Sequence, residues 1–247
     1  MANNWFQFKE FKIEQDQCGM KVSTDACIQG ALAADFLVGQ PKLKSVLDIG
    51  TGTGLLSLML AQKRNDITID ALEIDEQSAL QASENFKKSK WATQLSARHS
   101  SLQNWAIEKI NLKNGRYDFI ICNPPFFQNH LQSEKQQRNT ARHNVSLNAQ
   151  ELIDAAFQLL NPDGFFCMLY PENEWEMMEE LARKQRFHLY LLVKIQPKSN
   201  EANNRVVAFF SKRKRDFYLE KKIIIYQEDK VYTDDFIKLM QVYYLYL

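Results

Sequence analysis

The chain has 247 residues, of which 45% are hydrophobic and 25% are charged. These proportions are ordinary for a globular protein, and they exclude disorder, collagen and coiled coil as the main class. No apolar run approaches the ~20 residues that cross a bilayer, and the first residues lack the apolar core of a secretory signal. We therefore expect a cytoplasmic protein without a membrane segment.

The charge is unevenly distributed, although 31 basic side chains almost balance 30 acidic ones. Residues 183–222 carry 12 basic and 3 acidic side chains, a net charge of +9, whereas residues 1–182 carry 17 and 23, a net charge of −6. Such a basic block is typical either of a surface that binds a polyanion or of a solvated cationic face. The charge alone does not separate these two interpretations.

The four cysteines, Cys18, Cys27, Cys122 and Cys167, form no C-x-x-C pair. Each is interpreted as a small buried hydrophobic residue in a reducing compartment. The sequence also has no cluster of His and Cys at metal-ligand spacing, so we expect no bound metal.

Segments typical of strands alternate with segments typical of helices along most of the chain. In chain order we predict a strand at Ser45–Ile49, a helix at Leu55–Gln62, a strand at Thr68–Glu73, a helix at Asp75–Lys90, a strand at Leu95–Arg98, a helix at Leu102–Ile110, a strand at Tyr117–Cys122, a polar loop at Gln128–Asn148, a helix at Ala149–Leu160, a strand at Phe165–Tyr170, a helix at Glu172–Arg186, and strands at Leu189–Ile195 and Val206–Phe210. A compact domain seldom keeps a loop of ~20 residues without a functional reason.

This alternation predicts βαβ units and therefore an α/β fold with a parallel sheet and helices on both faces. The last two strands are joined by a loop, so we expect them to form an antiparallel pair at one edge. The order suits a seven-stranded, Rossmann-like sheet of the methyltransferase type. The doubly wound dinucleotide-binding fold is the competing prediction.

The first glycine-rich turn favours the methyltransferase-type sheet over the dinucleotide-binding fold. Gly50, Gly52 and Gly54 directly follow a strand, where glycines let the backbone turn tightly and approach a ligand. Asp48 precedes them, and its carboxylate would repel a pyrophosphate but suit a cationic sulfonium or ammonium group. Glu73 ends the next strand and is placed to accept ribose hydroxyls. The pattern predicts S-adenosyl-L-methionine rather than a nicotinamide cofactor, the alternative being a structural turn with a capping Asp.

The second motif is Asn123-Pro124-Pro125-Phe126, which follows another apolar strand. The prolines fix the backbone and leave carbonyl acceptors. An exocyclic amine that donates to the Asn123 oxygen and the Pro124 carbonyl is pulled toward sp³ geometry and aims its lone pair outward. Phe126 can stack on a flat substrate. The motif therefore predicts methyl transfer to a planar nitrogen, and a rigid turn is the alternative.

Taken together, these motifs make the chain resemble the bacterial tRNA1(Val) (adenine(37)-N6)-methyltransferases, which are class I methyltransferases. Phe8-Lys-Glu-Phe11 followed by Gln15–Asp25 resembles the leader of this family, and Met20–Asp25 is its specific part. Further similarity lies in Leu55–Gln62, Gln137-Arg138, Ala141-Arg142, Gly164–Cys167 and Tyr243–Leu247.

The resemblance implies methyl transfer to N6 of adenine 37 in that tRNA. By position, the three glycines would hold the methionyl end of the cofactor, and the N-P-P-F residues would hold the base. Residues 1–40 would form a segment over the site, with Lys21, Thr24 and Asp25 above the cofactor, and residues 41–247 the methyltransferase domain. The family commonly has an acidic residue where this chain has Ser101, so the contact to the cofactor's adenine is expected to differ.

The partner implied is tRNA, and we expect the protein to be a monomer. Arg138 and Arg142 in the long loop, and the run Lys212, Arg213, Lys214 and Arg215, are candidate phosphate contacts, with solvated side chains as the alternative. Two other functions stay open. One is the same chemistry on release-factor glutamine N5 or RNA guanine N2, and the other is a non-catalytic nucleic-acid-binding module.

Overall fold

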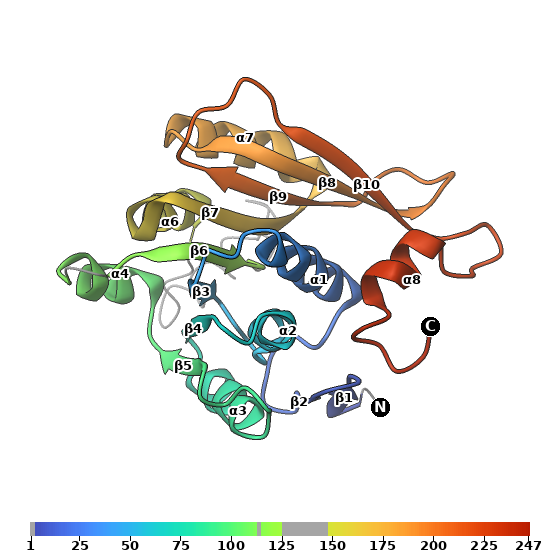
Figure 1. The fold of residues 1–247 in the computed structure, drawn as a ribbon, viewed down its shortest axis with the longest axis horizontal. Coiled ribbons are helices and arrows are strands. Elements are labelled where there is room, and N and C mark those ends of the chain that lie inside the picture. The colour runs from blue at the N-terminus through green and yellow to red at the C-terminus, as the bar shows by residue number, and fades with distance from the viewer. Residues whose placement is uncertain (1–2, 113–114, 125–147) are drawn as a thin grey trace, which may run out of the picture.

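The computed structural model describes residues 3–112, 115–124 and 148–247. Its main sheet has eight strands in the spatial order β10, β8, β9, β7, β6, β3, β4, β5 (Figure 1). Their bounds are β3 Ser45–Ile49, β4 Thr68–Glu73, β5 Leu95–His99, β6 Tyr117–Cys122, β7 Leu160–Pro171, β8 His188–Lys198, β9 Arg205–Ser211 and β10 Leu219–Tyr226. Within the described residues the α/β prediction is therefore confirmed.

Helices cover both faces of this sheet (Figure 1). One face packs against α1 Thr24–Val38, α2 Leu55–Lys63, α3 Glu76–Lys87 and α8 Asp234–Met240. The other face packs against α4 Leu102–Ile110, α6 Ala149–Leu159 and α7 Trp175–Lys184, which follows a short 3₁₀ turn at Glu172–Glu174. The central strands are buried on both faces, which explains why they are continuous apolar runs in the sequence.

The sheet departs from the prediction in two ways. It has eight strands instead of seven, because β10 pairs with β8 in parallel at the outer edge. The expected antiparallel pair is present as β8 and β9, but β10 covers its outer side, so the pair lies next to the edge instead of at it. The first half of β10 (Leu219–Lys222) is exposed and mostly charged, so it lacks the period-2 pattern that reveals a half-buried strand.

Strand β7 begins earlier than expected. The Asn161-Pro-Asp-Gly164 stretch follows the end of α6, but it belongs to the strand instead of a turn. The pairing of β6 with β7 shifts register between Tyr117 and Phe119, which accommodates this stretch. The Asn161 side chain donates to Asp118 Oδ1 at 2.8 Å. Turn-forming residues are thus absorbed by an irregularity in the ladder.

The N-terminal residues belong to the same hydrophobic core. Strands β1 (Trp5–Gln7) and β2 (Lys12–Glu14) form a hairpin, and Phe8 at its tip is fully buried. Phe8 forms a β-bridge with Tyr244 near the other end of the chain, and the Lys9 amide donates to the Tyr243 carbonyl at 2.8 Å. The last residues therefore hold the N-terminal hairpin against the domain.

The described residues also bear on the remaining general expectations. All four cysteines are buried and free, as predicted. In the part of the chain that the structure describes, no helix is both long and apolar enough to span a membrane.

Candidate active site

Three of the predicted site segments meet at one edge of the sheet. Strand β3 lies between β4 and β6, with Ile49 opposite Leu72 on one side and Cys122 on the other. Because these strands are parallel, the residues that follow them come together at their carboxyl ends. The glycine turn (Gly50–Gly54), Glu73 and Asn123 are therefore neighbours.

All three glycines of this turn have positive φ angles, 69° at Gly50, 53° at Gly52 and 83° at Gly54. L-residues avoid this conformation, so the turn requires glycine. A Cβ at Gly50 or Gly52 would meet nothing within 4 Å, whereas one at Gly54 would lie 2.4 Å from the Phe86 ring. The first two glycines border open space that a ligand can enter, and the third allows close helix packing.

The Glu73 carboxylate organises the turn through backbone amides. Its Oε2 accepts from Gly52 N at 2.9 Å, and its Oε1 accepts from the amides of Ile74 and Asp75 at 2.8 and 3.0 Å. A carboxylate oxygen has two lone-pair sites, so Oε1 is filled and Oε2 keeps one. Glu73 can therefore accept one further hydrogen bond without losing its hold on the turn.

Asp48 lies beneath the turn and is fully buried. Its Oδ2 accepts from the hydroxyls of Thr51 and Ser57, each at 2.7 Å, whereas Oδ1 has no hydrogen-bond partner. Burial raises the pKa of Asp48 from 3.8 to about 6, and the negative charge of Glu73 adds to the effect. The carboxylate thus braces the turn, and its ionised form is a buried negative charge that a cation above the turn would stabilise.

Asp48→Asn should make the stability less dependent on pH. Since the pKa of Asp48 is about 6 in the folded protein and 3.8 without burial, the folded state alone holds this proton between these values. The contribution of Asp48 to the wild-type free energy of unfolding should therefore fall by up to about 3 kcal/mol as pH rises from 4 to 6. The isosteric variant should lack this decrease. Urea unfolding of both proteins at pH 4, 5, 6 and 7 tests this, and parallel pH profiles would contradict it.

The N-P-P segment presents an unsatisfied acceptor at the same edge. The Asn123 Oδ1 atom is buried, and no described residue donates a hydrogen bond to it. Its backbone is fixed by Gln29 of α1, whose Nε2 donates to the Cys122 carbonyl at 2.8 Å, and Pro124 is buried. An unpartnered buried oxygen is costly unless a ligand satisfies it. Pro125, Phe126, Arg138 and Arg142 lie outside the described residues.

The residues expected above the cofactor have other partners. Lys21 Nζ donates to the Asn3 carbonyl at 3.3 Å, and Thr24 begins α1. The Asp25 carboxylate pairs with Arg205 Nε at 3.1 Å, at the ends of β9 and β7. These contacts place the three residues on the N-terminal segment and the start of α1, and their contact with a cofactor stays a prediction.

Ser101 has a structural role that the sequence did not reveal. It is the N-cap of α4, where its hydroxyl accepts from the Asn104 amide at 3.2 Å. The preceding residue, Ser100, donates its amide to the Glu73 carbonyl at 3.0 Å. Ser101 is therefore near the end of β4, and its hydroxyl can donate one hydrogen bond while it caps the helix.

The basic run after β9 is not brought to this edge. Strand β9 is antiparallel to β7, so the residues after Ser211 lie at the amino ends of the parallel strands. Lys212 Nζ donates to the Leu160 carbonyl at 2.6 Å, and burial lowers the pKa of Lys212 to about 8. Arg213 pairs with Asp163, and the Arg215 guanidinium lies 4.2 Å from the centre of the Tyr190 ring. Of the four side chains, Lys212 is the least suited to a phosphate contact.

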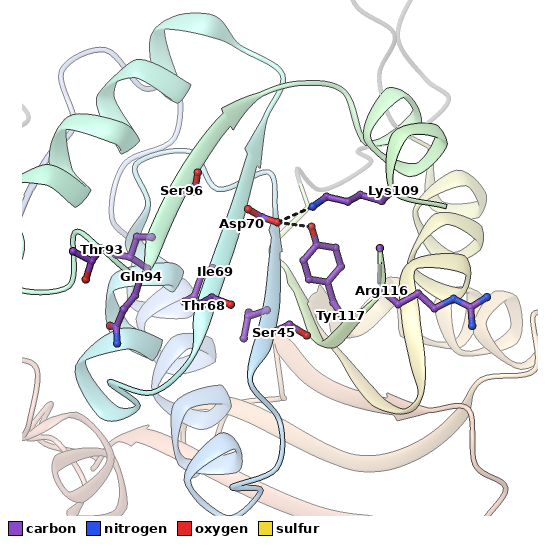
Figure 2. A pocket seen from close by; sticks show the side chains of 13 residues that line it. Ser45, Thr68, Ile69, Asp70, Thr93, Gln94, Ser96, Lys109, Arg116 and Tyr117 are labelled. Carbon is purple, nitrogen blue, oxygen red and sulfur yellow. Dashed lines mark hydrogen bonds and ion pairs between the residues drawn. The ribbon is translucent and has the colours of Figure 1, made fainter. Parts of the chain in front are cut away.

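A cavity of about 300 Å³ lies at the amino ends of strands β3, β4 and β6, opposite the glycine turn (Figure 2). Tyr117 and Lys109 both contact Asp70 Oδ2 there, at 2.7 and 3.3 Å, as the dashed lines in Figure 2 mark. The Tyr117 hydroxyl also accepts from Trp105 Nε1 at 3.1 Å. Because these groups satisfy one another and join α4 to the beginnings of β4 and β6, we assign them to stability.

Sequence reasoning missed two polar residues of the site. Gln29 fixes the Cys122 carbonyl, and Asn85 of α3 donates to the Thr53 carbonyl of the glycine turn at 2.9 Å. Both are buried amides on helices, and only contacts distant in sequence reveal their roles. Within the described ranges, no group of three or more His, Cys, Asp or Glu side chains is placed to hold a metal ion.

Comparison with known proteins gives the family. Residues 31–188 match the Methyltransferase small domain family. The chain is 35% identical to the tRNA1(Val) (adenine(37)-N6)-methyltransferase of Escherichia fergusonii and 34% identical to that of Cronobacter sakazakii, with 100% of this chain and 97% of each relative covered.

Solved structures show the same fold. A predicted O-methyltransferase from Agrobacterium tumefaciens has a TM-score of 0.66 at 14% identity, over 89% of this chain and 96% of its own. The T. thermophilus 16S rRNA N2 G1207 methyltransferase has a TM-score of 0.54 at 21% identity, over 86% of this chain and 52% of its own. With the full-length relatives, these findings show that the chain belongs to the tRNA1(Val) (adenine(37)-N6)-methyltransferase family.

Proposed function

We propose that the protein transfers a methyl group from S-adenosyl-L-methionine to N6 of adenine 37 in the anticodon loop of tRNA1(Val). The observation that carries this proposal is the unpartnered Asn123 oxygen beside the glycine turn. In the part of the chain that the structure describes this acceptor has no donor, and the amino group of adenine is a donor of the right kind. The names of the full-length relatives supply the substrate.

The residues at the glycine turn fit the cofactor. Gly50 and Gly52 leave open space for its methionyl end, and the free lone pair of Glu73 Oε2 suits a ribose hydroxyl. The buried Asp48 charge attracts a cation through a low-dielectric interior. When bound, S-adenosyl-L-methionine supplies the electrophilic methyl group. The chain's own residues orient it, and Ser101 is the candidate for the adenine end.

On the substrate side, Asn123 and Pro124 act by accepting hydrogen bonds. An adenine amine has its lone pair delocalised into the ring and is a weak nucleophile. Accepting its two N–H groups at Asn123 Oδ1 and the Pro124 carbonyl favours the pyramidal amine, whose lone pair points away from these acceptors. No general base is needed before transfer, and the surplus proton leaves afterwards to water. We propose that Pro125 helps to fix the backbone that carries these two acceptors, and that Phe126 stacks on the base.

The tRNA requires a cationic surface. We propose Arg138 and Arg142 for its phosphates, because they follow Phe126 by 12 and 16 residues in sequence. Arg213, Lys214 and Arg215 are second candidates for a distant part of the tRNA, since they lie at the opposite edge of the sheet. The protein would act in the cytoplasm as a monomer, with residues 1–40 over the site.

Binding and transfer assays test this proposal. Calorimetry should detect binding of S-adenosylhomocysteine and none of NAD, because a carboxylate at the turn repels a pyrophosphate. Labelled-methyl transfer to an adenine-37 tRNA1(Val) transcript should yield N6-methyladenosine, and the guanosine-37 transcript is the matched control. The guanosine-37 transcript should stay unlabelled. Label in guanine N2, no label in either transcript, or label in a release factor offered in a separate reaction would contradict the assigned substrate.

A further inference from the structure

Two buried amide side chains on one face of α3 connect the N-terminal segment to the site. Gln81 and Asn85 are four residues apart, so they point the same way from the helix. They are 5% and 1% exposed. Buried amides are retained where their hydrogen bonds are satisfied, so their partners show what they hold together.

Asn85 joins the N-terminal hairpin to the glycine turn. Its Oδ1 accepts from the Glu14 amide at 3.0 Å, and its Nδ2 donates to the Glu14 carbonyl and to the Thr53 carbonyl, both at 2.9 Å. These bonds use both donor hydrogens and one of the two acceptor sites of the side chain. One amide therefore fixes the end of β2 and the turn that borders the cofactor space.

Gln81 repeats this pattern one helical turn earlier. Its Oε1 accepts from the Gln17 amide at 3.1 Å, and its Nε2 donates to Asp16 Oδ1 at 2.6 Å. The next residues are fixed by Gln15, whose Oε1 accepts from the Val22 amide at 2.9 Å. Three amides of residues 14–22, those of Glu14, Gln17 and Val22, thus donate to side chains, whereas the Gln15 amide donates to the Asn4 carbonyl.

Residues 14–22 also approach Glu73, the last residue of β4. Burial raises the pKa of the Cys18 thiol, the Ser78 hydroxyl contacts it, and the negative charges of Glu73 and Asp75 add to the increase. Glu73 in turn accepts from the Gly52 amide. Residues 14–22 therefore run along α3 from the glycine turn to the vicinity of Glu73.

We propose that Gln81 and Asn85 are positioning residues that couple residues 14–22 to the glycine turn. A cofactor bound at the glycine turn stabilises the turn, Asn85 passes this stabilisation to the end of β2, and Gln81 holds the following residues on the same helix. The coupling is reciprocal, so loosening the segment weakens cofactor binding. This inference rests on the proposed function, because it requires the cofactor at the glycine turn.

Hydrogen exchange and calorimetry with S-adenosylhomocysteine test the coupling. In the wild type, the ligand should slow exchange of the Glu14, Gln17 and Val22 amides by about tenfold or more. Asn85→Ala should weaken binding about tenfold, the effect of one net hydrogen bond, and should abolish this slowing. Asn85→Asp keeps the acceptor but loses both donors, so it should behave in the same way.

Two further variants make the result specific. Gln81→Ala leaves the contact between Asn85 and Thr53 intact. It should therefore speed exchange of the Gln17 amide and weaken ligand binding less than Asn85→Ala does. If Asn85→Ala does not fold, the Gln81→Ala result alone tests the coupling. Gln103→Ala removes an amide that links α4 to Glu151 on α6, and it should change neither readout. Normal binding and normal slowing in the Asn85 and Gln81 variants would overturn the inference alone. Absence of binding to the wild type would overturn the proposed function, and the inference with it.

Discussion

Asn123→Ala should reduce kcat by about 10²–10³-fold while the KM for S-adenosyl-L-methionine stays close to the wild-type value. The lost acceptor matters most as the amine becomes pyramidal, so the variant loses ~2.7–4 kcal/mol of transition-state stabilisation. Among the described residues the Asn123 oxygen has no partner. Its removal breaks no hydrogen bond there, and the Tm should not fall.

Single-turnover methyl transfer to the adenine-37 tRNA, with a thermal melt of each protein, measures this effect. Asn161→Ala is the matched control, since that amide bonds Asp118 at the opposite edge of the sheet and should leave kcat unchanged. Near-normal turnover of Asn123→Ala would assign the N-P-P segment to a structural turn and reject the proposed mechanism.

Gly54→Ala should be the most destabilising single-methyl substitution in the glycine turn. The added Cβ would lie 2.4 Å from the ring of Phe86, which is 2% exposed in the core, and φ is +83°. Left-handed strain and overpacking together should lower the free energy of unfolding by about 2–5 kcal/mol. Urea denaturation measures this loss.

Gly39→Ala is the matched control at the end of α1. There φ is −71°, and an added Cβ would meet only the Phe36 and Asp35 carbonyl oxygens, at 3.4 Å and beyond. That substitution should be neutral or stabilising by ~0.4–1 kcal/mol, because it restricts the unfolded chain. Equal losses in both variants would mean that Phe86 does not limit the space at Gly54.

The sequence predicts the central part of this fold well because burial leaves a strong pattern there. Strands β3, β4 and β6 have the expected bounds, and Asp75 caps α3 as predicted. Helix α1 was not predicted, since nine of its residues, mostly small, are buried and it carries no clear polar face. Edge strand β10 was not predicted either. The charged residues of its first half do not show the alternation of apolar and polar side chains that reveals a half-buried strand.

Site residues divide in the same way. The glycine turn was predictable from sequence, because its positive φ angles require glycine at fixed positions. The filled Oε1 of Glu73, the helix cap at Ser101 and the bonds of Lys212 depend on contacts between distant elements. Residue type and spacing do not specify such contacts.

The contact between the two ends of the chain has a consequence for how the protein is made. Lys9 Nζ donates to the Gln241 carbonyl across 232 residues, and the Phe8–Tyr244 bridge lies beside it. A ribosome builds the hairpin first, so its aromatic side chains wait for their partners while the sheet forms. The tip of the hairpin is therefore secured last, because Phe8 and Lys9 lack these partners in a nascent chain without Gln241–Tyr244. We therefore expect the aromatic side chains of the hairpin tip to stay unpacked until residues 241–244 have been made.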